Sequence, residues 1–129
     1  EAHRAYVQLA GDMKPWWDAI EDLQRRIQST PGDEAREALI AERDVSLLAY
    51  IAQHGLAAKI DRLVLAFDEF TRCLDTRVCD EEVLDKAIGI DVKRIYRTYR
   101  PYILMRRAAG GKDATYGKDL EDLFFRLLG

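Results

Sequence analysis

The chain has 129 residues, 48% of them hydrophobic and 33% charged, with a formal net charge of −3. This length is that of one domain with a sizeable core, and the composition is typical of a globular protein. The small negative charge gives no overall field that would attract nucleic acid or anionic lipid, and no run of about 18 apolar residues predicts a membrane span.

An apolar stripe dominates residues 2–28. Its members recur every three or four positions: Ala2, Tyr6, Leu9, Met13, Trp16, Ile20, Leu23 and Ile27. This spacing predicts one long amphipathic helix, or two nearly coaxial ones. We expect a kink at Pro15, because its ring crowds the carbonyl of Gly11 four residues earlier. Such a stripe also permits self-association of the chain through this helix.

Two further helices are predicted before residue 75. Thr30 is placed to cap the first of them, with Pro31 as its first residue and its end near His54. Its second half is apolar nearly all round, which predicts a central place in the bundle. The next helix spans about 56–74, and we expect these two helices to form the core.

Residues 75–79 predict a turn, after which Asp80 caps a short helix that ends at Gly89. Asp91 is placed to cap another helix, which Pro101 should bend. A glycine-containing loop at 109–115 precedes a last helix. The chain is therefore predicted to be all-α: a single domain over 1–129, folded as an irregular antiparallel bundle of five or six helices.

Two cysteines, Cys73 and Cys79, are separated by five residues. We favour two reduced thiols near a helix turn. A small disulfide loop is the alternative, and it would indicate an exported protein of the immunity or inhibitor type. The only histidines, His3 and His54, match no zinc-ligand spacing, so neither a metal nor a cofactor is expected.

A basic run lies in the predicted helix that starts at Asp91. Lys93, Arg97 and Arg100 share one face of it and alternate with tyrosines. Arginines interleaved with aromatic residues are typical of nucleic-acid binding where the face is open. We favour the plainer interpretation, in which the tyrosines pack inward and the arginines pair with nearby acidic residues.

No residue pattern indicates catalysis. The sequence has no nucleophile beside a histidine and an acid, no phosphate-binding loop and no metal-ligand set. Asp68 and Glu69 lie among aromatic residues, where a carboxyl can have a raised pKa, but a structural role is favoured for both. We therefore expect a protein that is not an enzyme.

Trp16 and Trp17 are the best candidates for a partner contact, because large aromatic side chains anchor interfaces. Adjacent helical positions point about 100° apart, which predicts a buried Trp16 and a half-exposed Trp17. The favoured function is a non-enzymatic protein-interaction or regulatory module. Nucleic-acid binding through Lys93, Arg97 and Arg100 is the alternative.

The segment from about Leu65 to Leu127 resembles an uncharacterised bacterial family, domain of unknown function 4760. The likeness is carried by Phe67-Asp68-Glu69-Phe70, Asp80-Glu81-Glu82, Tyr99-Arg100-Pro101-Tyr102-Ile103, Arg106 or Arg107, Tyr116 and Leu120-Glu121-Asp122-Leu123. The resemblance implies a bacterial helical domain and supplies no catalytic residues. It also implies an interior polar link between Glu69 and Arg106 or Arg107.

Members of that family often have a membrane-anchoring helix before the helical domain. This chain begins at Glu1 rather than Met and shows no such helix. It is therefore expected to be either a free-standing cytoplasmic relative or a fragment that lacks its N-terminal segment. In the second case it would be the soluble part of a membrane-anchored protein.

Overall fold

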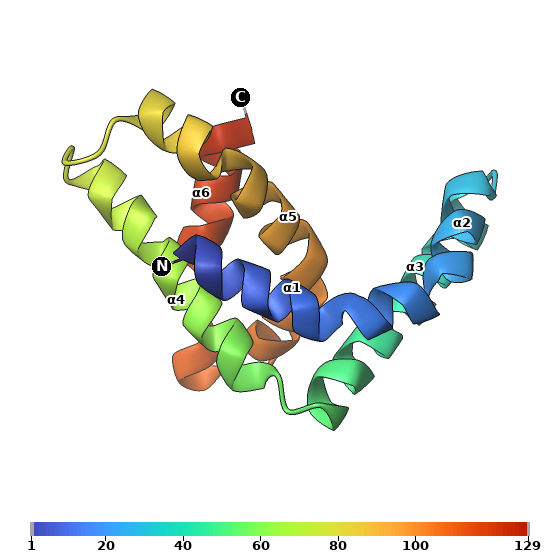
Figure 1. The fold of residues 1–129 in the computed structure, drawn as a ribbon. Helices are drawn as coiled ribbons and strands as arrows, with labels where there is room; N and C mark the ends of the chain where they lie inside the picture. Colours follow the sequence, from blue (N-terminus) through green and yellow to red (C-terminus); the bar gives the residue numbers. More distant parts are fainter. Residues whose placement is uncertain (1, 129) are drawn as a thin grey trace.

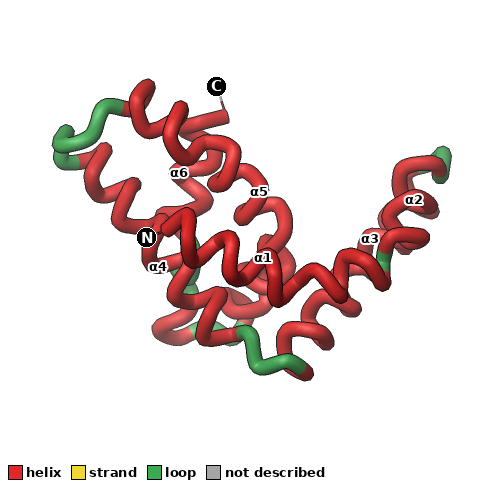
Figure 2. The backbone as a smooth tube through the Cα atoms, in the orientation of Figure 1, coloured by secondary structure: helices red, strands yellow, loops and turns green. Residues whose placement is uncertain are grey.

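The computed structural model describes residues 2–128, and within that range it contains helices and turns but no strand (Figures 1 and 2). The elements in chain order are α1 (Ala2–Ala19), α2 (Glu21–Ser29), α3 (Asp33–Gln53), α4 (Ala57–Asp75), α5 (Glu81–Ala108), the 3-10 turn η1 (Gly111–Asp113) and α6 (Lys118–Leu128). The predicted all-α bundle is confirmed.

Four helices form the body of the molecule. α4 and α5 diverge from each other, α6 packs against both of them, and α1 crosses in front (Figure 1). Their almost fully buried side chains make one core: Leu9 and Met13 of α1, Ile60, Leu63, Val64 and Phe67 of α4, Val92, Ile95 and Ile103 of α5, and Leu120 and Leu123 of α6.

The first amphipathic segment is two helices, but they do not meet at the proline. Pro15 lies inside α1, whereas the break falls at Ile20, between α1 and α2. Pro15 and Gly11 are both exposed, so the carbonyl that loses its helical partner faces solvent. The break between the two helices therefore lies five residues after the proline.

α2 and the first part of α3 (residues 21–46, called the arm here) stand away from the body (Figure 1). The turn between them depends on Gly32, whose φ of 91° favours glycine. Thr30 was predicted to cap the following helix, but it ends α2, where its hydroxyl donates to the carbonyl of Arg26. Gly32 occupies the cap position of α3 instead.

The prediction that α3 lies at the centre of the bundle is wrong. Only Leu47 and Ile51 of this helix are buried, and Val45 is 68% exposed. The apolar side chains of α3 are divided between two neighbours, because this helix contacts α2 in the arm and α5 in the body. α4, in contrast, is as central as predicted.

Residues 81–108 form one helix of 28 residues where the sequence predicts two. Asp80 caps it as predicted, because its side chain accepts a hydrogen bond from the amide of Glu82 at 3.0 Å. Gly89 does not end the helix, and Asp91 does not start another. Gly89 is buried in the helix interior, where burial in the body compensates for the weak helix propensity of glycine.

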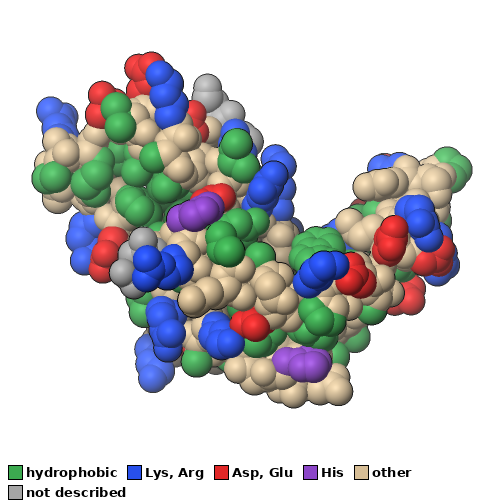
Figure 3. Space-filling view, viewed as in Figure 1, with side chains coloured by type: hydrophobic (Ala, Val, Ile, Leu, Met, Phe, Trp, Pro, Cys, Tyr) green, Lys and Arg blue, Asp and Glu red, His purple; other side chains and the backbone are tan. Residues whose placement is uncertain are grey.

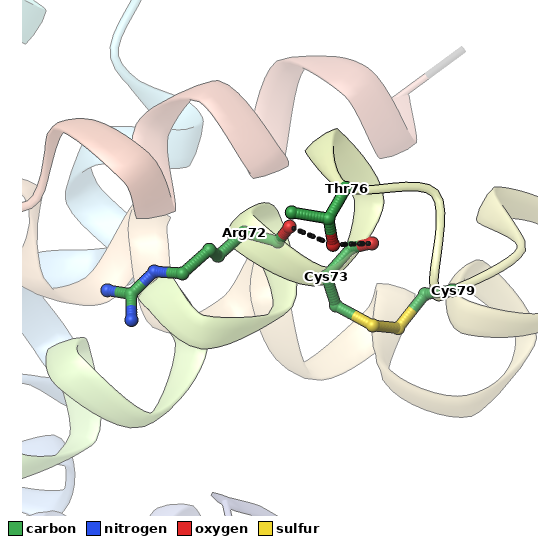
Figure 4. Close-up of a disulfide and its surroundings, with 4 residues drawn as sticks. All are labelled: Arg72, Cys73, Thr76 and Cys79. Carbon is green, nitrogen blue, oxygen red and sulfur yellow. Dashed lines mark hydrogen bonds between the residues drawn. A yellow bond between two sulfur atoms is a disulfide. The ribbon is translucent and has the colours of Figure 1, made fainter.

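Cys73 and Cys79 form a disulfide across the turn between α4 and α5, with their Cα atoms 5.3 Å apart (Figure 4). The favoured prediction of two reduced thiols is therefore wrong. The hydroxyl of Thr76 donates to the carbonyls of Arg72 and Cys73, at 3.0 and 3.2 Å, and holds the same turn from inside. The disulfide and this side chain together fix the end of α4.

Candidate functional site

The two tryptophans lie where the arm leaves the body. Trp16 is buried, and its indole Nε1 donates to the hydroxyl of Ser46 on α3 at 3.0 Å. Trp17 is 38% exposed, and its ring meets that of Trp16 edge-on with 4.7 Å between centroids. The predicted division between a buried and a half-exposed tryptophan is confirmed. Trp16 thus joins α1 to α3 at the base of the arm, and Trp17 lies partly exposed beside it.

A surface groove runs along the junction of α1 and α5 and continues beneath the arm. It consists of two adjoining hollows of about 420 and 380 Å³, which share Trp17, Arg97 and Thr98. The first is also lined by Trp16, Gln24, Arg43, Asp44, Leu47, Arg100 and Pro101, and the second by Tyr6, Ala10, Met13, Arg94 and Tyr99. We call this feature the Trp–Arg groove. In Figure 3 the surface is hollowed between body and arm, with apolar, basic and acidic side chains around the hollow.

The groove unites two features that the sequence presents separately. Trp17 comes from α1, and Arg97 and Arg100 come from α5, about 80 residues later. Lys93, the third predicted basic residue, lies one turn before Arg97 and lines neither hollow. Two arginines that were not predicted as contacts do line the groove. Arg94 belongs to the same basic run, whereas nothing in the sequence around Arg43 of α3 marks it as a site residue.

The basic face of α5 is largely free of acidic partners. Among the described residues, no ion pair joins a carboxylate to Lys93, Arg94, Arg97 or Arg100, although Arg106 and Arg107 further along α5 are paired. The predicted pairing with acidic neighbours therefore holds only for the end of the helix. Arg97 does have one aromatic contact, since its guanidinium carbon lies 5.6 Å from the centroid of the Phe124 ring.

Arg43 and Asp44 line the arm side of the groove. Arg43 donates to the amide oxygen of Gln24 at 2.9 Å, which links α3 to α2. Burial raises the pKa of the Asp44 carboxyl, and the charges of Arg43 and Arg100 lower it in part. Asp44 of the arm and Arg100 of α5 line the same hollow.

A second cluster of polar side chains lies at the other end of α5. Asp61 of α4 accepts hydrogen bonds from Arg106 at 2.6 Å and from the Tyr116 hydroxyl at 2.5 Å. Arg106 also pairs with Asp113 at 3.2 Å and lies over the Tyr116 ring, 4.2 Å from its centroid. Burial and the bond to Asp61 raise the pKa of Tyr116. The cluster joins α4, α5 and the loop before α6.

This cluster corrects the predicted polar link. Arg106 and Arg107 do tie elements together, but Glu69 is exposed and its side chain has no hydrogen bond or ion pair among the described residues. Arg107 pairs with Glu121 at 3.2 Å and donates to the carbonyl of Tyr116 at 2.7 Å. Asp61, Asp113 and Glu121 are therefore the carboxylates of the link.

Asp68 lies beside this cluster, at the edge of a third hollow of about 370 Å³. The pKa of Asp68 is raised to about 6, chiefly by burial and also by the charge of Asp119, while a hydrogen bond from the Leu120 amide and the charge of Arg72 lower it in part. One carboxylate oxygen has no hydrogen-bond partner. Asp68 is therefore a half-buried carboxyl whose charged form is disfavoured at this position.

Within residues 2–128, no group of three or more His, Cys, Asp or Glu side chains is arranged to hold a metal ion. None of the described helices has both the length and the apolar composition needed to cross a membrane.

Comparison with known proteins adds no relative, because no family model, curated protein or solved structure matches this chain. The resemblance to the domain of unknown function 4760 stays a prediction. The function must therefore be argued from the groove itself.

Proposed function

We propose that the protein is a non-enzymatic interaction module that binds a protein partner in the Trp–Arg groove. One observation carries the proposal: a half-exposed tryptophan from α1 and unpaired arginines from α5 line the same concave surface. Tryptophan and arginine are the residue types most enriched among those that dominate binding energy at protein interfaces. A partner that covers Trp17 removes apolar surface from water, and the arginines give the contact its orientation.

The test is a comparison of protein captured from an extract of the source organism by four immobilised forms of the chain. Wild type is compared with Trp17→Ala, with the double variant Arg97→Glu, Arg100→Glu, and with Lys86→Glu as a charge-reversal control outside the groove. Lys86 is exposed on α5 and lines neither hollow of the groove. We expect a protein that wild type and the control retain and that both groove variants lose. Equal retention by all four forms would contradict the proposal.

Nucleic acid is an alternative occupant of the same surface, since the unpaired arginines of α5 suit phosphate as well as carboxylate. Nuclease treatment of the extract separates the two. Retained material that disappears after nuclease, and that leaves at moderate salt, would replace the protein-binding proposal with nucleic-acid binding.

The disulfide supports a second candidate, an exported protein of the immunity or inhibitor type. Disulfides persist in oxidising compartments and are rare in the cytoplasm, which is the location expected from the sequence. A count of free thiols in native protein, trapped with an alkylating reagent before denaturation, decides between an exported protein and a cytoplasmic module. No free thiol supports export, and two free thiols support the cytoplasmic module.

A further inference from the structure

The charges along the groove are unusually one-sided for an acidic chain. Arg94, Arg97 and Arg100 follow one another at three-residue intervals, so their positions advance by about 4.5 Å each along the axis of α5. Asp44 is the single carboxylate among the lining residues of the two hollows. With a net charge of −3 for the whole chain, this surface is a local basic strip on an acidic molecule.

The opposite wall of the groove is apolar. α1 contributes Tyr6, Ala10, Met13 and Trp17, and these positions span about 16 Å of helix. A ligand that fills the groove therefore meets guanidinium groups along one edge and aromatic and aliphatic surface along the other. Free guanidinium groups bind carboxylates with paired, charge-assisted hydrogen bonds.

An amphipathic helix with acidic residues beside its apolar stripe matches both walls. Carboxylates three or four residues apart on such a helix repeat at the same interval as the arginines of α5. The length of the groove corresponds to about 11 residues of helix. Nucleic acid is the competing occupant of this surface, because its phosphates also pair with arginines and its bases stack on aromatic side chains.

We propose that the partner segment is an acidic amphipathic helix that sets its carboxylates on Arg94, Arg97 and Arg100 and a large apolar side chain on Trp17. This inference rests on the proposed function, and names the chemistry of the partner at that same groove.

The first part of the test is a selection from a displayed library of random peptides. Peptides are enriched on wild-type protein and counter-selected on the triple variant Arg94→Gln, Arg97→Gln, Arg100→Gln, after circular dichroism has shown that this variant is folded. The expected survivors carry an excess of Asp and Glu at three- or four-residue spacing, together with large apolar residues. Survivors without an acidic excess, or the failure of any peptide to prefer wild type, overturn the proposal.

The second part measures affinity for a selected peptide. The chain has two tryptophans, and both line the groove, so their fluorescence reports binding at this site. We expect Arg97→Gln to weaken binding roughly two- to five-fold, which is the value for partly exposed ion pairs. Glu→Gln changes in the peptide should weaken binding by a similar factor. Lys86→Gln should bind as wild type does, and affinity should fall as salt rises. Equal affinity for the acidic and the amide peptide overturns the proposal.

The two experiments separate this inference from the proposed function. If capture depends on Trp17 but the selected peptides are neutral or basic, the groove is an interaction site for a different kind of segment, and only the acidic-helix inference fails. If capture is also indifferent to the groove variants, the proposed function fails. A single-stranded oligonucleotide that displaces the peptide and binds more tightly overturns the inference in favour of nucleic acid.

Discussion

Arg106 is the residue at which several elements meet. It donates to Asp61 of α4 and to Asp113 of the loop before α6, and its guanidinium lies over Tyr116. The family resemblance implied a link through Arg106 or Arg107 with Glu69 as its carboxylate, whereas Arg106 pairs with Asp61 and Asp113. Asp61 is 45 residues away from Arg106, and a charged residue at such a distance is not marked as a partner by any local pattern.

The partner assignment is tested by comparing Asp61→Asn with Glu69→Gln. Asp61→Asn removes the charge that faces Arg106 and should lower the free energy of unfolding by about 2 kcal/mol, the usual value of a hydrogen bond to a charged group. Glu69→Gln, which changes an exposed carboxylate on the same helix, should change it by less than about 0.5 kcal/mol. Urea denaturation measures both. Equal losses would restore Glu69 to the link.

Asp68 gives a second prediction, which depends on pH. Its pKa is about 6 in the folded chain against 3.8 for an unperturbed aspartate, so the folded state binds the proton more tightly than the unfolded state. Ionisation of Asp68 therefore costs stability above about pH 6, and the cost is relieved as pH falls towards 4. Because the side chain is partly exposed, the cost is about 1 kcal/mol.

The variant Asp68→Asn should consequently be more stable than wild type at pH 7.5 by about 1 kcal/mol, and should lose that advantage at pH 4.5. Asparagine keeps a side-chain oxygen for the Leu120 amide, so the substitution removes the charge without removing that acceptor. Asp122→Asn, at an exposed position of α6, is the control and should show no such pH-dependent difference from wild type. A constant difference between Asp68→Asn and wild type across this range would contradict the assignment.

Capping and helix-ending residues predicted the helix boundaries correctly where their local preference agreed with the packing of the helix. Asp80 was predicted as a cap from its side chain and the two glutamates that follow it, and it is one. Gly89 and Thr30 misled for different reasons, packing in the case of Gly89 and a competing local hydrogen bond in the case of Thr30. A buried glycine continues a helix that is held on both sides, and Thr30 serves the helix before it rather than the helix after it.

The arm differs from the body in how much apolar surface it buries. Ile27 is the one buried side chain of α2, and α3 has none before Leu47. Local opening free energies follow burial, so the arm should open more readily than α4, α5 and α6.

Native-state hydrogen exchange measures this difference. Amides in residues 24–42 should exchange through local opening, with a free energy at least about 2 kcal/mol below that of the central residues of α5. Gly32→Ala should lower protection in the arm further, because alanine is strained at the φ of 91° found there. Protection in the arm equal to that of α5 would show that the two parts open as one unit.

At the scale of the whole molecule, several residues of the candidate site could be predicted from the sequence, but their convergence in one groove could not. Trp17, Arg97 and Arg100 were predicted as contacts, and they line one groove. Their convergence depends on how α1 crosses α5 and on the angle at which the arm leaves the body. Both depend on contacts between residues far apart in the sequence, such as that of Trp16 with Ser46. The apolar spacing within one helix carries no information about such contacts.

The same packing bears on self-association. The apolar stripe of residues 2–28 was predicted to permit self-association, but Leu9 of α1 and Ile20, at the break before α2, are only 2% and 5% exposed within the single chain. A second copy could reach them only if α1 left the body, which would expose the core that Leu9 and Met13 share with α4 and α5. The stripe is therefore a core surface, and a charge placed there should destroy folding rather than separate two folded copies.

Leu9→Glu decides between the two roles. A buried unpaired carboxylate in this core should cost about 4 kcal/mol or more, which is a large part of the stability of a domain of this size, so far-ultraviolet circular dichroism should show loss of helix. Val7→Glu, on the exposed side of the same helix, should keep the wild-type spectrum. Sedimentation of wild type should give the monomer mass of 14.8 kDa. A folded, monomeric Leu9→Glu beside a dimeric wild type would instead assign the stripe to an interface between copies.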